Sequence, residues 1–390
     1  MAAFEGVDYY ALDGLLSDEQ KLVRDTVREF VSDKILPVID EHQREGTFPV
    51  EVLPGMAAMG LLGANLEGYG LPGLDNISYG LILQELERGD SGLRSFVSVQ
   101  GALCMYPIWR YGSEAQKQQW LPAMGRGDVI ACFGLTEPDA GSDPGAMRTC
   151  AEFDGDEWVL NGVKYWITNG TIAQLAIVWA KTDKGIQGFL VPTDTPGFSA
   201  NKITGKYSLR VSDTAELVLQ DCRISADNVL PDAEGLKGPL TCLNQARYGI
   251  SWGAVGAAMA CYDEALRYAK NRIAFGRPVA ATQLMQELLV ECVTEITKAQ
   301  LMCLRLGQLK EAGTVTPQQV SMAKRNNVLM ALNTARTCRE ILGGNGILDD
   351  YQSFRHMVNL ESVYTYEGTH QIHTLIVGHD ITGYSAFGER

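Results

Sequence analysis

The sequence predicts an α+β multidomain fold, with an N-terminal helical domain, a middle β domain and a C-terminal four-helix bundle. The chain has 390 residues, more than one hydrophobic core usually organises. Apolar residues recur at helical spacing near both ends, whereas in the middle they alternate at a period close to two. These changes in periodicity predict domains at residues 1–128, 129–235 and 236–390.

Two helix-start signals predict the N-terminal domain. Ser17 followed by Gln20 is a candidate capping box, and apolar residues then recur at helical spacing up to Pro37, which is expected to end the helix. Ser113 is a second candidate N-cap and opens a short helix that runs into Pro122.

β-branched and aromatic residues mark the middle domain. Residues 158–167 alternate around Asn161 and Gly162, which supply the two positive-φ positions of a type I′ turn and so predict a β-hairpin. Residues 176–180 and 188–191 predict further strands.

Two long segments predict the C-terminal bundle. Residues 284–312 keep helical periodicity with Gly307 as their single breaker, and residues 318–342 contain no Gly or Pro. Helices of this length favour an antiparallel bundle.

The composition argues against several classes of partner. A net charge of −14, with basic residues scattered along the chain, disfavours nucleic acid or an anionic membrane surface. Nine cysteines without a CxxC pair indicate reduced thiols and no metal site. Residues 1–16 lack Lys and Arg, unlike a signal or transit peptide, and no apolar run predicts a membrane span. We expect a cytoplasmic protein, if bacterial, or a mature mitochondrial matrix protein, if eukaryotic.

Three short runs carry the candidate chemistry: residues 133–143 (FGLTEPDAGSD), 165–170 (YWITNG) and 365–370 (TYEGTH). In this order and at this spacing they closely resemble the acyl-CoA dehydrogenase family of flavoproteins, over essentially the whole chain. The resemblance implies the helical–β–helical plan, an FAD cofactor, an acyl-CoA substrate and a homotetramer. It also implies reoxidation of the flavin by electron-transfer flavoprotein.

An isoalloxazine ring needs an aromatic or apolar wall and hydrogen bonds at its polar edges. Trp166 and Thr168 lie two apart on a predicted strand and so face one side, although the local pattern alone favours an ordinary half-buried strand pair. The resemblance places five residues at the flavin: Trp166, Thr168, Phe133, Leu135 and Thr136. It places Gly141 and Ser142 near the pyrophosphate and the acyl-CoA.

The ADP half of FAD needs donors for its pyrophosphate. The guanidinium of Arg272 can pair bidentately with phosphate, and Gly343 and Gly344 permit close backbone approach. A surface charge and a helix C-cap are the alternatives. In the family these segments come from a neighbouring subunit. The resemblance adds further cofactor contacts at Phe275, Gln283, Thr369 and Gln371.

Glu367, between Tyr366 and Gly368, is the candidate catalytic base. Oxidation of an acyl thioester removes a weakly acidic α-proton, which requires a rigidly placed carboxylate in a water-poor pocket. Its own amide can hydrogen-bond the thioester carbonyl as negative charge develops. A solvated surface charge is the alternative, and the resemblance favours the base.

Asn244 and Arg247 are three residues apart on a predicted helix and so share a face. The resemblance places them along the CoA chain. An intrahelical polar pair is the alternative.

Arg94 opens an apolar run that contains no other charge before Arg110. A cation facing an apolar cavity is costly unless an anion pairs with it, and a substrate that ends in a carboxylate would supply one. Glu87 and Ser98 can share its helical face. The alternative is a pair between Arg94 and Asp90 on a wet surface.

The substrate-side residues resemble the glutaryl-CoA dehydrogenase branch of the family. That branch oxidises and decarboxylates glutaryl-CoA to crotonyl-CoA and carbon dioxide, although some members stop before decarboxylation. A short- or branched-chain acyl-CoA dehydrogenase, an acyl-CoA oxidase and a non-catalytic flavoprotein scaffold are the competing interpretations. The candidate substrate-binding residues are Glu87, Arg94, Ser95, Ser98, Ser142, Asn244, Arg247 and Tyr366, with Glu367 as the catalytic residue.

Overall fold

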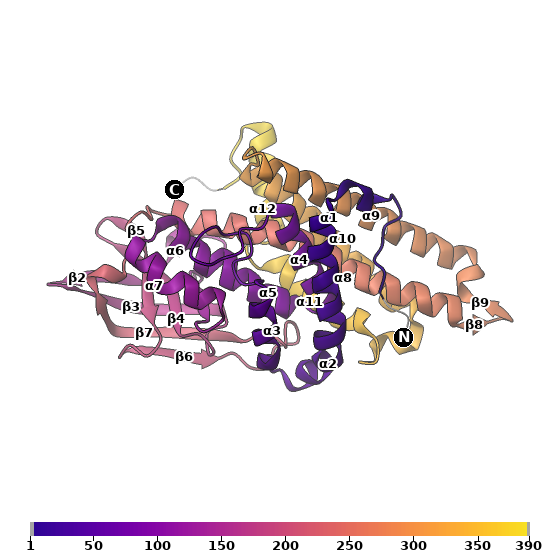
Figure 1. Cartoon of the computed structure of the whole chain (residues 1–390), viewed down its shortest axis with the longest axis horizontal. Coiled ribbons are helices and arrows are strands. Elements are labelled where there is room, and N and C mark those ends of the chain that lie inside the picture. Colours follow the sequence, from indigo (N-terminus) through magenta and orange to yellow (C-terminus); the bar gives the residue numbers. More distant parts are fainter. Residues whose placement is uncertain (1–3, 388–390) are drawn as a thin grey trace.

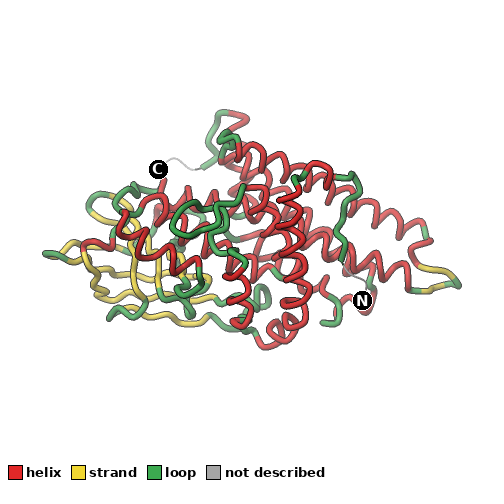
Figure 2. Tube along the Cα trace, viewed as in Figure 1, coloured by secondary structure: helices red, strands yellow, loops and turns green. Residues whose placement is uncertain are grey.

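The protein is described by a computed structural model that covers residues 4–387. The molecule is elongated, with a β-sheet at one end and long helices that run from it to a small hairpin at the other (Figure 1). Figure 2 shows that the strands are confined to these two ends, with helices between them.

The N-terminal region is helical, as expected, and its capping boxes form. Ser17 accepts a hydrogen bond from the Gln20 amide while the Gln20 side chain bonds back to the Ser17 amide, and Ser113 repeats the arrangement. The helices and helical turns of this region are η1 (Leu12–Leu15), α1 (Asp18–Phe30), η2 (Val31–Ile35), α2 (Leu36–Glu45), η3 (Val50–Val52), α3 (Leu53–Ala58), α4 (Asn76–Gly89), α5 (Ser91–Ser98), η4 (Val99–Met105), α6 (Tyr106–Tyr111) and α7 (Glu114–Gly125).

Pro37 does not end the first helix, so this expectation was wrong. The π-helical turn η2 joins α1 to α2, and Pro37 occupies the first turn of α2. An amide has no intrahelical acceptor in a first turn, so proline is tolerated there.

The middle region forms a seven-stranded sheet in the order β1-β4-β2-β3-β7-β6, with β5 paired to β4. The strands expected at residues 176–180 and 188–191 are confirmed as parts of β4 and β5. The elements of this region are β1 (Ala131–Gly134), η5 (Pro144–Ala146), β2 (Cys150–Asp154), β3 (Glu157–Thr168), β4 (Leu175–Thr182), β5 (Gly185–Pro192), β6 (Phe198–Lys202), β7 (Thr214–Ser225) and η6 (Ala226–Asn228).

The hairpin predicted at Asn161 and Gly162 was also wrong, because β3 runs straight through both residues. The β3–β7 register shifts between Leu160 and Gly162, and a Cβ on Gly162 would overlap Thr149. Glycine is therefore required at this bulge by close backbone approach, and not by a turn.

The C-terminal region is helical, and the segments expected at residues 284–312 and 318–342 are confirmed as α9 and α10. Its elements are α8 (Lys237–Asn271), β8 (Ile273–Ala274), β9 (Arg277–Pro278), η7 (Val279–Ala281), α9 (Gln283–Glu311), α10 (Pro317–Ile341), η8 (Gly343–Ile347), α11 (Gln352–Thr365) and α12 (His370–Thr382).

One apolar core joins the N-terminal and C-terminal helices. It includes Leu86 of α4, Phe96 of α5, Val255 of α8 and Ala331 of α10. Within residues 4–387, no helix is long and apolar enough to cross a membrane, and no cluster of three or more His, Cys, Asp or Glu side chains is placed to hold a metal. The shared core fixes α4, α5, α8 and α10 relative to one another.

Candidate active site

The loop between α11 and α12 presents Glu367 to the helical core. Tyr366 forms the C-cap of α11, and the hydroxyl of Thr369 caps α12 by accepting from the Ile372 amide at 3.2 Å. Glu367 has a φ of 51° and Gly368 a φ of 96°. A non-glycine residue with positive φ is strained, so contacts around the loop must hold Glu367 in place.

Arg94 and Glu87 form a fully buried ion pair across the break between α4 and α5. Arg94 is 0% exposed, and its Nε donates to Glu87 Oε2 at 2.7 Å. Ser91 donates to the other carboxylate oxygen at 2.9 Å. Arg94 Nη2 donates to the hydroxyl of Tyr366. The arginine therefore lies inside the core beside the loop that carries Glu367.

Asp90 is not the partner of Arg94, so the wet surface pair considered above is absent from the described residues. Asp90 is buried and accepts from Arg355 Nη1 at 2.8 Å and from Asn359 Nδ2 at 2.9 Å, both on α11. Asn359 Oδ1 in turn accepts from the Leu209 amide at 2.8 Å. This network fixes the start of α5 against the helix that leads to Glu367.

Several buried polar atoms at this place have no hydrogen-bond partner among residues 4–387. Because buried polar groups in native proteins are nearly always satisfied, they mark where the polar ends of a ligand can bind. The atoms are Arg94 Nη1 and Glu367 Oε2, and beside them the hydroxyls of Ser98 and Tyr79, whose nearest partners are each other. The site thus offers an unsatisfied cation donor and an unsatisfied carboxylate oxygen together. Ser95, next to Arg94, is buried.

The charges around Glu367 are unequal. Burial raises the pKa of Glu367, and the cations Arg94, Arg247 and Lys324 counteract part of this rise. Burial also lowers the pKa of Lys324 to about 7. Three cations thus face two carboxylates, those of Glu367 and Glu87. The excess favours an anionic ligand while Lys324 is protonated.

Arg247 supports the loop from α8. Its Nε donates to the Glu367 carbonyl oxygen at 2.7 Å, and its Nη1 donates to Asn244 Oδ1 at 3.3 Å. Asn244 and Arg247 therefore share a helical face, as expected, and also form the intrahelical pair that was the alternative. Their contact with a CoA chain stays a prediction.

The residues expected at the flavin come from two segments of the middle region, the end of β1 with the loop after it and the end of β3. The Tyr165 amide donates to the Thr136 carbonyl at 2.8 Å and so joins these two segments. Trp166 is 58% exposed with a φ of 62°, and the β3–β7 register shifts between Lys164 and Ile167. Simple strand alternation therefore does not describe this segment. Thr168 and Thr136 are half-buried, whereas Gly141 and Ser142 are exposed.

Phe133 and Leu135 are buried in a core that joins the sheet to helices of the N-terminal region. Contacts of these two residues with a flavin are therefore expected from their backbone. The ring plane of a flavin suits the exposed indole of Trp166, and its polar edge suits the hydroxyls of Thr136 and Thr168.

A cavity of about 410 Å³ is lined by residues expected at the ADP half, Arg272, Gly343 and Gly344. Apart from the adjacent backbone, no atom of the described chain lies within 4 Å of a Cβ built on either glycine, so the backbone is open to a ligand there. The donor set fits a pyrophosphate. Phe275 and Gln283 are exposed near the β8–β9 hairpin, and Gln371 is exposed on α12.

The two halves of the expected FAD site lie far apart in one chain. The sheet with Trp166 is at one end of the molecule, whereas the β8–β9 hairpin, next to Arg272, is at the other (Figure 1). One chain therefore does not bring them together.

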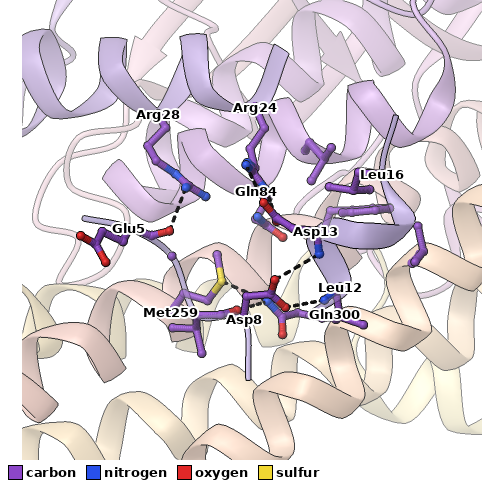
Figure 3. A pocket seen from close by; sticks show the side chains of 15 residues that line it. Glu5, Asp8, Leu12, Asp13, Leu16, Arg24, Arg28, Gln84, Met259 and Gln300 are labelled. Carbon is purple, nitrogen blue, oxygen red and sulfur yellow. Dashed lines mark hydrogen bonds and ion pairs between the residues drawn. The ribbon is translucent and has the colours of Figure 1, made fainter. Parts of the chain in front are cut away.

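A second cavity, of about 60 Å³, lies beneath the N-terminal segment (Figure 3). Asp8 accepts from the amides of Leu12 and Asp13, Arg28 donates to the Glu5 carbonyl, and Gln300 donates to the Val7 carbonyl at 2.6 Å. These contacts satisfy most of the polar groups named, although Gln300 Oε1 is buried without a hydrogen-bond partner among residues 4–387. The cavity holds no buried pair of an unsatisfied cation donor and an unsatisfied carboxylate oxygen among the described residues, unlike the cluster at Glu367.

The sequence analysis missed Tyr79, Lys324 and His373, which surround the same loop. Lys324 had a detectable signal, because it lies four residues from both Val320 and Val328 on the buried face of α10. Tyr79 and His373 lie on helices that gave no comparable signal, since a buried aromatic or histidine is usually a core residue.

Comparisons with known proteins cover most of the chain. Three family profiles match: Acyl-CoA dehydrogenase, N-terminal domain, over residues 17–128; middle domain, over 132–222; and C-terminal domain, over 233–382. The mitochondrial short-chain specific acyl-CoA dehydrogenase of Homo sapiens is 36% identical over 377 residues, which are 95% of this chain and 92% of that protein.

Solved structures give a second comparison. Two structures of glutaryl-CoA dehydrogenase from Mycobacterium smegmatis, the second in complex with FADH2, are 51% and 50% identical to this chain, each with a TM-score of 0.97. They cover 98% of this chain and 100% and 99% of their own. A glutaryl-coenzyme A dehydrogenase in complex with glutaryl-CoA is 32% identical, covers 94% of this chain and 96% of its own, and has a TM-score of 0.90.

Proposed function

The chain belongs to the acyl-CoA dehydrogenase family and is an FAD-dependent enzyme, and on that premise we propose that it oxidises and decarboxylates glutaryl-CoA. The products are crotonyl-CoA and carbon dioxide, and the electrons pass to electron-transfer flavoprotein.

The observation that carries this proposal is the buried guanidinium of Arg94. Its Nε and Nη2 bond to Glu87 and Tyr366, but Nη1 has no partner among residues 4–387. A substrate with a free carboxylate at the far end of its acyl chain would satisfy that donor. An uncharged acyl chain would leave it unsatisfied, at a desolvation cost.

Glu367 is proposed as the base at the other end of the acyl chain. Burial raises the pKa of its carboxyl group, which makes the carboxylate a stronger base for the weakly acidic α-proton. Oε2 is buried and has no partner in the described chain, so it is free to accept this proton. When bound, FAD accepts the hydride from the β-carbon.

The decarboxylating outcome rests on Tyr366 and Arg94. Loss of carbon dioxide leaves a dienolate, which the amide of Glu367 can stabilise at the thioester oxygen. The protonated Glu367 can then return its proton at the γ-carbon. The contact between Tyr366 and Arg94 places a hydroxyl beside the proposed carboxylate site. A non-decarboxylating glutaryl-CoA dehydrogenase is the alternative.

The separation of the flavin-facing and ADP-facing residues supports an assembly of several chains. We propose that the cavity with Arg272, Gly343 and Gly344 serves the flavin held at Trp166 of a neighbouring copy, within a homotetramer.

A short-chain acyl-CoA dehydrogenase is the second candidate, favoured by the 36% identity to the human short-chain enzyme. The experiment that separates the two adds glutaryl-CoA to the purified protein with an artificial electron acceptor and identifies the products by mass spectrometry. Crotonyl-CoA with released carbon dioxide supports the proposal, whereas glutaconyl-CoA alone contradicts decarboxylation. Flavin bleaching by butyryl-CoA but not by glutaryl-CoA would support the short-chain enzyme.

A further inference from the structure

Lys324 of α10 is a buried cation beside the candidate base. The side chain is 1% exposed, and its Nζ donates to the carbonyl oxygen of Tyr366 at 3.1 Å and to that of Gly368 at 2.8 Å. Arg247 donates to the intervening carbonyl, that of Glu367, at 2.7 Å. Lys324 and Arg247 together thus bind the carbonyl oxygens of three consecutive residues, 366, 367 and 368, of which the middle one is the candidate base.

These contacts meet a structural need of the loop. Glu367 and Gly368 have positive φ angles, so the loop continues neither α11 nor α12 and its carbonyls lack helical partners. A buried amino group without acceptors would be strongly destabilising. The side chain bonds to backbone on either side of Glu367, and within residues 4–387 no ion pair links it to the carboxylate. The carboxylate therefore stays free to take a proton.

We propose that Lys324 is a positioning residue for Glu367, which clamps the carbonyls of residues 366 and 368 and so fixes the carboxylate in its reactive orientation. This inference rests on the proposed role of Glu367 as the base. Lys324 of α10 thus acts on the reaction through the loop that carries Glu367, without touching the substrate.

The clamp does not depend on the protonation state of Lys324. A neutral amine has two N–H donors and an ammonium has three, so either form can bond both carbonyls. The charge still acts on Glu367, because a nearby cation favours the ionised carboxylate. The other titratable or charged groups that face Lys324 are Glu367, Arg247 of α8, Arg94 of α5, Glu87 of α4 and both His370 and His373 of α12.

The test compares Lys324→Met with Arg325→Met in anaerobic stopped-flow reduction of the flavin. Arg325 is the next residue of the same helix, and its Nε donates to the Thr374 hydroxyl at 2.7 Å rather than to the loop. We expect Lys324→Met to slow flavin reduction about 100-fold, the effect of a misplaced reacting group, while Arg325→Met matches the unmodified enzyme.

Two further readouts separate positioning from a general loss of structure. The dissociation constant of a thioether acyl-CoA analogue, which cannot be oxidised, should stay unchanged in Lys324→Met. The acid limb of the pH–rate profile should move to higher pH, because loss of a cation raises the pKa of Glu367. If Lys324→Met does not fold with its flavin, Lys324→Gln is used, since its shorter amide removes the charge and cannot reach both carbonyls.

Unchanged reduction with an unmoved acid limb would overturn the proposal. So would an equal loss in both variants, or slower reduction explained by weaker analogue binding. The substrate in these assays is whichever of glutaryl-CoA and butyryl-CoA reduces the flavin of the unmodified enzyme. Failure of glutaryl-CoA there counts against the proposed substrate, and the comparison of variants with butyryl-CoA still decides the role of Lys324.

Discussion

Replacing Arg94 with alanine tests the proposed substrate most directly. The guanidinium is fully buried, pairs with Glu87 at 2.7 Å and keeps Nη1 for a ligand. Removing one partner of a buried charge pair costs about 2–5 kcal/mol. At about 1.4 kcal/mol per factor of ten, kcat/KM for glutaryl-CoA should fall from about 30-fold to several thousand-fold.

The variant also leaves the Glu87 carboxylate buried without its cation, which destabilises the protein and lowers its activity on any substrate. Butyryl-CoA measured on the same preparation corrects for this, because its uncharged chain makes no ion pair. The quantity to report is therefore the ratio of kcat/KM for glutaryl-CoA to that for butyryl-CoA, from initial rates of acceptor reduction.

Arg88→Met is the matched control. Arg88 is also buried and donates to Glu85 Oε2 at 2.9 Å, but it lies toward the N-terminal segment, where its Nη2 contacts the Arg28 carbonyl and the Ser32 hydroxyl. We expect its loss to lower stability without changing the substrate ratio. Equal losses on both substrates in Arg94→Ala would refute the carboxylate-binding role.

Three further predictions follow from the same geometry. Glu367→Gln should bind acyl-CoA without bleaching the flavin, and retained bleaching would remove Glu367 from the base role. In the unmodified enzyme, kcat/KM should fall as pH decreases through the pKa of Glu367, which burial raises above the usual range of glutamate. Gly253→Ala should lower the glutaryl-to-butyryl ratio, because its Cβ would overlap the Glu87 carboxylate, whereas Gly378→Ala on α12, whose Cβ meets no described atom within 4 Å, should not change that ratio; equal ratios in the two variants would contradict the pair's role. Glu137→Gln should lower the free energy of unfolding by about 3 kcal/mol, because it leaves Lys164 buried without its 2.9 Å partner. Burial alone would raise the pKa of Glu137, but hydrogen bonds from the Arg148 and Thr149 amides and from Lys164 lower it to about 2. The contribution of Glu137 to stability is therefore present above the ordinary pKa of glutamate and is lost as pH falls toward 2. Urea denaturation at neutral and acidic pH measures this contribution, and equal stability of Glu137→Gln and the unmodified protein at neutral pH would contradict the prediction.

The three-part architecture could be predicted from the sequence because it follows from changes in periodicity. The structure and the family matches confirm it, together with the helix starts at Ser17 and Ser113. Local rules failed where tertiary context decided. Proline at position 37 begins a helix after a π-helical turn, and Asn161 and Gly162 lie within one long strand.

In the candidate active site, too, the sequence predicted some features and missed those that depend on tertiary contacts. A buried Arg94 could be inferred from its apolar surroundings, but its partner depends on how the chain breaks at Asp90 between α4 and α5. The sequence put Glu87 on the helical face of Arg94 and gave Asp90 as the alternative ion-pair partner. In the structure Asp90 is the N-cap of α5 and binds Arg355 and Asn359, so Arg94 pairs with Glu87. The burial of Lys324 could have been inferred from its place between Val320 and Val328, but its role could not, because its acceptors are backbone carbonyls 42 and 44 residues away, which side-chain patterns do not encode.

The distance between Trp166 and the Arg272 cavity has a thermodynamic consequence. If each FAD spans two copies of the chain, cofactor binding and subunit association become linked equilibria, so each strengthens the other. Dilution would then release flavin, and added FAD would draw subunits together and raise the midpoint of thermal unfolding. The cofactor in such an assembly serves as a reporter of association, readable from the yellow colour of the protein at each concentration.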